Sequence, residues 1–195
     1  PEKQKHYLRT IYDTACDMEG LVDNLFLFSK LDMGKMDFQM ESISVKTYLA
    51  DFCEEARLKV QGSTVKIRLD DQLKEERFVT IDRTQFARVL WNLLENSLKY
   101  AGKKNKEMKI ILSEEKKNVA LHFEDNGSGV EQEALEKIFD SFYRTDPARS
   151  SLKRGSGLGL SVSREIIEGF GGSIYAEAAE IGGLAVIMLL PIAED

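Results

Sequence analysis

The sequence predicts an α+β fold: a two-layer sandwich in which helices cover one face of a mixed β-sheet. Three observations lead to this prediction. The chain opens with a long segment of helical periodicity, short extended runs follow in pairs, and further helical segments lie between those pairs. Paired strands with helices gathered between them favour a sheet that is covered on one face. A chain of 195 residues, 43% of them hydrophobic and 31% charged, is long enough for one full domain and an appendage.

The opening segment, residues 1–35, differs from the rest of the chain. Its apolar residues recur at alternating steps of three and four, which is typical of a helix that packs against other helices in a bundle or coiled coil. They are Leu8, Ile11, Ala15, Met18, Val22 and Leu25, with Leu21 and Phe28 widening the stripe. A single helix cannot bury such a face, so we expect it to pack on a partner helix, a second chain or the domain that follows. Gly34 suits the end of the helix, and residues 36–195 form the second predicted unit.

Residues 36–195 combine strand and helix patterns. Period-two alternation and the turn signals between apolar runs locate the elements. Strands are expected at 37–45, 64–70, 77–81, 108–113 and 119–125, and helices at 46–60, 83–100 and 157–169. The runs SIYAEA and LAVIMLLP complete the chain as a β-hairpin.

Composition excludes several classes of function. The net charge of -6 argues against a general nucleic-acid binder, because such proteins present clustered positive charge. No run of about 18 apolar residues exists and the first residues do not form a signal peptide, so this segment is expected to be cytoplasmic, with no membrane span of its own. Cys16 and Cys53 lack the spacing of a metal site and are expected to be reduced and structural.

Four short motifs indicate a site for ATP. They are NLLENSLKY at 92–100, DNGSG at 125–129, FDSFYR at 139–144 and GSGLGL at 155–160. In this order and at these distances they resemble the N, G1, F and G2 boxes of the catalytic ATP-binding domain of sensor histidine kinases, within the wider family that includes the Hsp90 and gyrase ATPase domains. The resemblance covers roughly residues 31–192 and implies the architecture called the Bergerat fold.

The first motif places polar residues on one face of a helix. Asn92, Asn96 and Lys99 are separated by four and three residues, so they project from nearly the same side. Magnesium prefers oxygen ligands and keeps several waters, so one amide oxygen together with phosphate oxygens is a reasonable site. The resemblance implies that Asn96 binds Mg²⁺, Asn92 joins the phosphate network, Lys99 contacts a phosphate and Tyr100 lines the nucleotide site. Related ATPases have a glutamate where Asn92 stands, and an amide there disfavours hydrolysis by water.

The second motif follows a predicted strand that ends at Asp125. A carboxylate in this place can accept a hydrogen bond from the exocyclic amine of adenine, whereas guanine carries a carbonyl at the corresponding position. We expect Gly127 and Gly129 to let the backbone pass close to the base. His122, in the middle of the same strand, is expected to be a surface or packed histidine rather than a catalyst.

The last two motifs flank a basic stretch, residues 139–157, that reads as a lid over the nucleotide. Phe139 and Phe142 resemble the aromatic anchors of this lid, and Arg144 matches a family arginine that reaches toward the terminal phosphate. Glycines that open a helix expose backbone N–H groups to phosphates. The nucleotide-binding residues assigned to this motif are Gly155, Gly157, Leu158, Gly159 and Leu160. Solubility alone would also explain the basic residues Arg149 and Lys153.

The resemblance also exposes an absence. In the family the phosphate-accepting histidine lies in a motif resembling HELRTPL, upstream of the join between the helical hairpin and the catalytic domain, and nothing in this sequence matches it. The run HYLRT at His6 echoes the motif but lies on what should be the second helix of the hairpin, so His6 is expected to be a solvated residue.

The sequence therefore predicts a histidine kinase catalytic domain that binds ATP and Mg²⁺, with Asn96, Lys99 and Arg144 as catalytic residues. Its γ-phosphate would pass to a histidine on a dimerisation helix, in the same chain or the partner chain of a homodimer, and then to a response regulator. The intact protein could be anchored in the membrane through segments outside this sequence. Two alternatives remain open: a non-catalytic ATP-binding adaptor of the same fold, and an ATPase of the gyrase, MutL or Hsp90 kind.

Four positions depart from the pattern of the family. Ser97 replaces a usual alanine, Ser141 a usual proline and Arg154 a usual glycine, and Phe170 stands where histidine is common. None of these changes removes a group that the chemistry requires.

Overall fold

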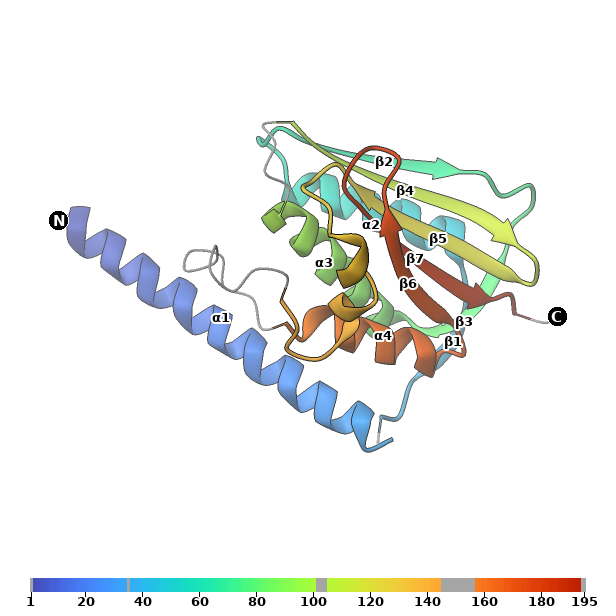
Figure 1. Cartoon of the computed structure of the whole chain (residues 1–195), viewed down its shortest axis with the longest axis horizontal. Coiled ribbons are helices and arrows are strands. Elements are labelled where there is room, and N and C mark those ends of the chain that lie inside the picture. Colours follow the sequence, from blue (N-terminus) through green and yellow to red (C-terminus); the bar gives the residue numbers. More distant parts are fainter. Residues whose placement is uncertain (1, 35, 101–104, 145–156, 194–195) are drawn as a thin grey trace.

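The computed structural model describes residues 2–34, 36–100, 105–144 and 157–193, apart from the side chains at 2, 6, 13, 16, 17 and 32 (Figure 1). Its helices are α1 (Glu2–Asp32), α2 (Val45–Lys59), α3 (Arg83–Tyr100) and α4 (Gly159–Gly169), with short 3-10 turns η1 (Gln132–Ala134) and η2 (Lys137–Phe139). Its strands are β1 (Met40–Ser44), β2 (Val65–Asp71), β3 (Phe78–Asp82), β4 (Lys106–Glu115), β5 (Asn118–Asp125), β6 (Ser173–Ala178) and β7 (Leu184–Pro191).

Five strands form one mixed sheet in the order β2-β4-β5-β7-β6. Strands β2 and β4 are parallel, and the other neighbours are antiparallel. The short strands β1 and β3 pair with each other, and a single bridge from Val79 to Ile192 connects them to the end of the chain. This register puts the last residue of β5, Asp125, at an end of a central strand beside β4 and β7.

Helices α2, α3 and α4 cover one face of the five-stranded sheet (Figure 1). Alternate residues of the central strands point into this layer and are buried: Met108, Ile110 and Leu112 of β4, Val119, Leu121 and Phe123 of β5, and Val186, Met188 and Leu190 of β7. They share one core with buried helix residues, among them Leu49, Phe52, Leu90, Leu94, Ile166 and Ile167. Each such side chain stabilises the fold by about 1.5–3 kcal/mol relative to exposure. The two-layer α+β sandwich predicted from the sequence is confirmed.

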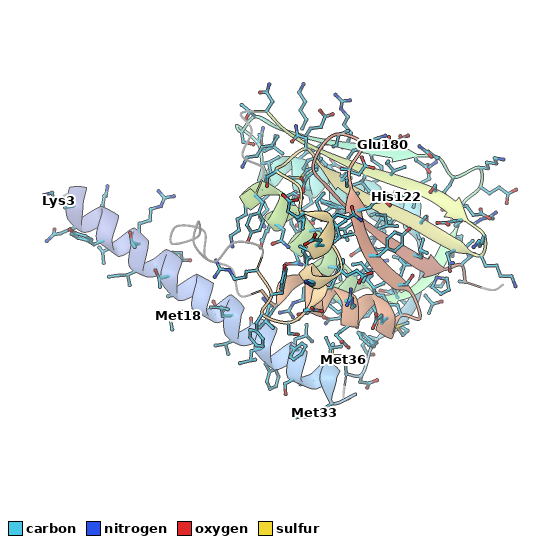
Figure 2. All side chains as sticks on the ribbon, viewed as in Figure 1. Lys3, Met18, Met33, Met36, His122 and Glu180 are labelled. Carbon is cyan, nitrogen blue, oxygen red and sulfur yellow. The ribbon has the colours of Figure 1, made fainter. Side chains whose placement is uncertain are left out.

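The opposite face of the sheet is partly covered by the loop between β6 and β7. Ala179 at the start of this loop packs with Ala185 and Ile187 of β7 in a second, smaller apolar cluster. His122 of β5 pairs with Ile187 and therefore shares this face, and Figure 2 labels it together with Glu180 of the loop. His122 is half-buried in the middle of β5.

Helix α1 touches the domain with a different face from the one that the sequence emphasised. Leu27 and Leu31 near its C-terminal end are buried against the domain, where α1 lies beside α4. Most of the predicted seam stays exposed, as shown by Leu8 at 67%, Val22 at 65% and Met18, which projects from α1 into solvent (Figure 2). Among the described residues, the following domain contacts only the C-terminal end of this stripe, at Phe28.

The boundaries of three elements differ by two residues or more from those expected. The first strand begins at Met40 because the N–H of Gln39 donates to the carboxylate of Asp82 and not to a strand partner. Helix α4 begins at Gly159 because Gly157 has a positive φ of 71°. Strand β4 extends beyond its predicted run, and η1 and η2 carry too few residues for a periodic signal. None of the described helices combines the length and the apolar character that crossing a bilayer requires.

Candidate functional site

Helix α3 carries the polar residues that the sequence places along the nucleotide. Asp82 caps its start, because Oδ1 accepts the N–H of Gln85 at 3.0 Å. One side of the helix is buried in the core through Phe86, Val89, Leu90, Leu93 and Leu94. Asn92 and Asn96 lie half-buried at the border of this side, one turn apart. The core thus fixes the face of α3 from which both side chains project.

At the C-terminal end of β5, Asp125 is hydrogen-bonded to Ser97 of α3. The Ser97 hydroxyl donates to Asp125 Oδ2 at 2.9 Å, and the two residues are only 4% and 9% exposed. The other oxygen, Oδ1, accepts the N–H of Gly127 at 2.8 Å and the N–H of Leu184 at 3.4 Å. Three donors from three segments therefore fix the plane of this carboxylate. The sequence predicted its place at the strand end but not these partners.

Gly183, in the loop between β6 and β7, lies directly against Asp125. A Cβ atom at this glycine would overlap the Asp125 carbonyl oxygen and stand 2.5 Å from Oδ1. Gly129 has a φ of 67°, and the carbonyl oxygen of Gly183 lies 3.3 Å from where its Cβ would be. Two backbone segments can approach here only because both positions are glycine. Sequence reasoning missed Gly183, since a glycine pair between two strands is an ordinary turn signal.

Asn126 ties the turn after β5 to the beginning of β4. Its Oδ1 accepts the N–H of Glu107 at 2.9 Å, and its Nδ2 donates to the carbonyl of Asn105 at 3.0 Å. The backbone N–H of Asn126 also donates to the Glu107 carbonyl at 3.1 Å. These bonds hold the turn that carries Gly127 in place. We call Ser97, Asp125, Gly127 and Gly183 the base end of the site.

The start of α4 approaches α3 closely at Asn92. Asn92 Nδ2 donates to the Ser163 hydroxyl at 3.0 Å, which donates in turn to the Gly159 carbonyl at 3.0 Å. A Cβ atom at Gly159 would overlap Asn92 Oδ1. The contact between the two helices therefore requires glycine at this position, and Asn92 holds the first turn of α4.

The N-terminus of α4 is suited to an anion. Its N-cap residue, Leu158, makes no side-chain capping bond, and the first turn contains no acidic residue. The first N–H groups of a helix have no intrahelical acceptor, and the helix dipole makes this end positive. Phosphate is therefore favoured here. Asn92 and Ser97 are five residues apart, so the start of α4 and the carboxylate of Asp125 attach to α3 about 7.5 Å apart along its axis.

Phe142 and Gly157 meet where the chain leaves η2 and where it returns to α4. The N–H of Phe142 donates to the Gly157 carbonyl at 2.9 Å. Both residues have positive φ angles, 66° and 71°, which is strained for phenylalanine. A Cβ atom at Gly157 would stand 2.8 Å from the carbonyl carbon of Phe142. We call Asn92, Phe142, Gly157, Gly159 and Ser163 the phosphate end of the site.

The two aromatic residues of the third motif behave differently. Phe139 is 2% exposed and anchors η2 in the core, where the guanidinium of Arg164 lies 4.5 Å from its ring centroid. Phe142 is 62% exposed. The anchoring role expected of both residues therefore describes Phe139, while Phe142 contributes its backbone to the phosphate end.

The remaining predicted site residues lie near the end of α3 or beside the phosphate end. Lys99 is half-buried, with Nζ 5.5 Å from the ring centroid of Tyr100, and Tyr100 itself is exposed. Arg144 is exposed, Leu158 is buried and Leu160 is half-buried. Gly155 and the basic residues Arg149, Lys153 and Arg154 lie outside the described residues, as do the side chains of His6 and Cys16. Cys53 is a buried free thiol whose pKa is raised by burial.

A second carboxylate precedes Asp125 on β5 and lies on the opposite face of the sheet. Glu124 is 4% exposed, and its Oε2 has no hydrogen-bond partner among the described residues. Burial raises the pKa of Glu124, and the ammonium group of Lys109 on the neighbouring strand offsets part of that rise. Two successive residues of one strand thus present one carboxylate with three donors and one with an unpartnered oxygen.

Comparison with known proteins identifies the class to which this fold and site belong. Residues 81–194 match the family model described as histidine kinase-, DNA gyrase B- and HSP90-like ATPase, and the chain belongs to this family. It is 31% identical over 180 residues to the sensor histidine kinase WalK of Bacillus subtilis (strain 168). It is also 32% identical over 177 residues to the signal transduction histidine-protein kinase BaeS of Escherichia coli (strain K12). These alignments cover 91% and 90% of this chain, but the chain spans only 29% of WalK and 37% of BaeS.

Solved structures agree with this assignment. The catalytic domain of histidine kinase ThkA superposes with a TM-score of 0.66 at 27% identity, covering 79% of this chain and 96% of that domain. Full-length ShkA in complex with AMPPNP superposes with a TM-score of 0.80 at 19% identity over 99% of this chain and 40% of ShkA, and at that identity it supports the fold alone. The chain is thus homologous to the ATPase domain of sensor histidine kinases.

Proposed function

We propose that this chain binds ATP between its base end and its phosphate end and transfers the γ-phosphate to a histidine on a helix outside this sequence. The 6-amino group of adenine would donate a hydrogen bond to the Asp125 carboxylate, and the phosphates would lie at the start of α4. The phosphate would then pass to an aspartate of a response regulator, and the intact protein would act as a homodimer. WalK and BaeS carry the names of sensor and signal transduction kinases, and a ThkA structure is a complex with the response regulator protein TrrA.

Asn92 is the observation that favours transfer to histidine over hydrolysis. Its amide is neutral. Its Nδ2 donates to the Ser163 hydroxyl, and its Oδ1 lies against Gly159. An amide cannot accept a proton from water as a general base does, so the position where related ATPases have a glutamate cannot activate water here. A γ-phosphate held in this way remains available to a stronger nucleophile such as a histidine nitrogen.

The residues present are compatible with Mg²⁺ that arrives together with ATP. The described residues contain no group of three or more histidine, cysteine or acidic side chains that could hold a metal. Asn96 offers one amide oxygen, and Mg²⁺ commonly takes its other ligands from phosphates and water. When bound, Mg²⁺ would offset the charge of the phosphates. We infer that Lys99 and Arg144 contact phosphate, because cations near developing negative charge stabilise a transition state.

Phosphotransfer to a supplied acceptor tests this proposal. The chain is mixed with ATP labelled at the γ-phosphate, Mg²⁺ and the complete two-helix hairpin of its parent kinase. We expect acid-labile label on the hairpin, formed weakly because no tether supplies a high effective concentration. Asn96→Ala should abolish the labelling by removing the metal ligand, and His6→Ala should leave it unchanged.

The other outcomes separate the alternatives. Release of labelled inorganic phosphate without labelling of the hairpin would indicate an ATPase. Nucleotide binding without either reaction would indicate a regulatory adaptor. Accumulation of acid-labile phosphate on His6 of this chain alone would contradict the assignment of α1 as the second helix of the hairpin.

A further inference from the structure

We propose that Ser97 positions the Asp125 carboxylate to accept a hydrogen bond from a purine 6-amino group, and thereby helps to determine which nucleobase binds. The inference rests on the proposed function, since it requires adenine at the base end. Ser97 does not itself contact the base in this proposal. It acts through Asp125, as a positioning residue.

The direction of the Ser97 hydroxyl is the first observation. A serine inside a helix commonly donates to the backbone carbonyl one turn earlier. Ser97 instead donates across the layer to Asp125 Oδ2 at 2.9 Å, with both residues buried. A buried hydrogen bond to a charged acceptor is stronger than one between neutral groups, and its geometry is not loosened by solvent. The hydroxyl therefore joins the end of β5 to the last turn of α3.

The lone pairs of the carboxylate are the second observation. A carboxylate has about four acceptor sites, two on each oxygen. The N–H groups of Gly127 and Leu184 both donate to Oδ1, and Ser97 donates to Oδ2. One acceptor site is left, and it lies on Oδ2. The protein thus defines both the oxygen and the direction from which a ligand donor can approach, which suits a 6-amino group and opposes a 6-carbonyl.

Removal of the hydroxyl should make this direction less defined. In Ser97→Ala, the bonds from Gly127 and Leu184 still hold Oδ1, but the carboxylate can pivot about that oxygen. Oδ2 then offers two acceptor sites in place of one. The loss of affinity should therefore appear only with a nucleotide that carries a 6-amino group.

Calorimetric titration with two nucleotides tests the proposal in the full chain. One is ATP, and the other is purine riboside 5′-triphosphate, which lacks the 6-amino group, each with Mg²⁺. We expect Ser97→Ala to weaken ATP binding about three- to tenfold, the scale of one hydrogen bond, and to change binding of the purine analogue by less than about twofold. Asp125→Asn should weaken ATP binding more than Ser97→Ala does. Adding Ser97→Ala to Asp125→Asn should cause no further loss, because the carboxylate that Ser97 orients is gone.

Equal weakening of ATP and the purine analogue by Ser97→Ala would overturn the proposal and would show a packing role only. Fully additive losses in the double variant would do the same. Neither result affects the proposed function. That function would lose its adenine site in a different case: if the wild-type chain bound both nucleotides equally and Asp125→Asn changed neither.

Discussion

The base end and the phosphate end of the site differ in the chemical groups that form them. At the base end, a buried carboxylate is surrounded by donors from α3, from the turn after β5 and from β7. At the phosphate end, the start of a helix, two glycines and the backbone of an exposed phenylalanine come together, and the Asn92 and Ser163 side chains hold the helix start in place. In our proposal, the first arrangement discriminates between bases by the direction of a hydrogen bond. The second would present a positive helix terminus to the phosphates, so the proposal assigns base selectivity and charge neutralisation to different ends of the site.

The largest effect is expected at the base end from Gly183→Ala. The new methyl group would overlap the backbone of Asp125 and press on Oδ1, so the carboxylate must move. We expect ATP affinity to fall by about 100-fold, since the bond to the base is charge-assisted and worth about 1.5–3 kcal/mol. The free energy of unfolding should fall by about 1–3 kcal/mol, as in other overpacked sites. Calorimetry and thermal denaturation measure the two losses.

Gly182→Ala is the matched control in the same loop. Gly182 has a φ of 87°, but a Cβ atom there would meet no atom within 4 Å. This variant should lose stability through backbone strain, by about 1 kcal/mol, while keeping its ATP affinity. If both alanines reduced ATP affinity equally, the loop as a whole and not the contact with Asp125 would control binding.

A smaller loss of ATP affinity is expected at the phosphate end from Gly159→Ala, and it should depend on the phosphates of the ligand and not on its base. The methyl group would overlap Asn92 Oδ1, which is the end of a side chain and can yield. We expect ATP affinity to fall by about 1–2 kcal/mol, toward the low end of overpacking costs. Adenosine affinity should not change, because adenosine carries no phosphate. Competition binding with the two ligands checks this, and Asn92→Ala should restore part of the loss in the double variant. Equal losses for ATP and adenosine would mean that the two ends are not separable.

The smallest effect concerns the two neighbouring carboxylates of β5. Burial raises the pKa of Glu124 above its ordinary value of 4.5, so the folded state favours the protonated form. The stabilisation from that form is complete below pH 4.5 and is lost as pH rises through the folded-state pKa. Glu124→Gln should therefore be more stable than wild type at neutral pH, by about 1 kcal/mol or less, and no more stable below pH 4.5. Melting curves between pH 4 and 8 measure this difference, and a gain that is independent of pH would contradict it.

The sequence was sufficient for the elements and for the class of site, and insufficient for the contacts. Periodicity and turn residues predicted α3 and β5 because both are long and strongly patterned. The bond from Ser97 to Asp125 joins residues 28 positions apart, and no local pattern specifies which side chain of a helix faces the end of a strand. Gly183 was missed for a related reason, since a glycine that makes room for a carboxylate has the same local signature as one in a simple turn.

Helix α1 shows the same limit for packing faces. The seam of Leu8, Val22 and their neighbours was identified from spacing alone, yet the domain packs on Leu27 and Leu31. These two residues are one turn apart, and their face also contains Asn24, which accepts a bond from Arg88 of α3. A polar residue in a short apolar face weakens its sequence signal. The tertiary contact, and not the stronger periodicity, determined which face meets the domain.

Asp82 connects the junction after α1 to helix α3 through two hydrogen bonds. One carboxylate oxygen caps α3 at Gln85, and the other accepts the N–H of Gln39 in the connection from α1. Three turns further along α3 lie Asn96 and Ser97. A helix keeps its length when one end is displaced, because its backbone hydrogen bonds resist stretching. A displacement of Gln39 would therefore bear first on the cap of α3, and the same helix carries Ser97, whose hydroxyl donates to Asp125, at its other end.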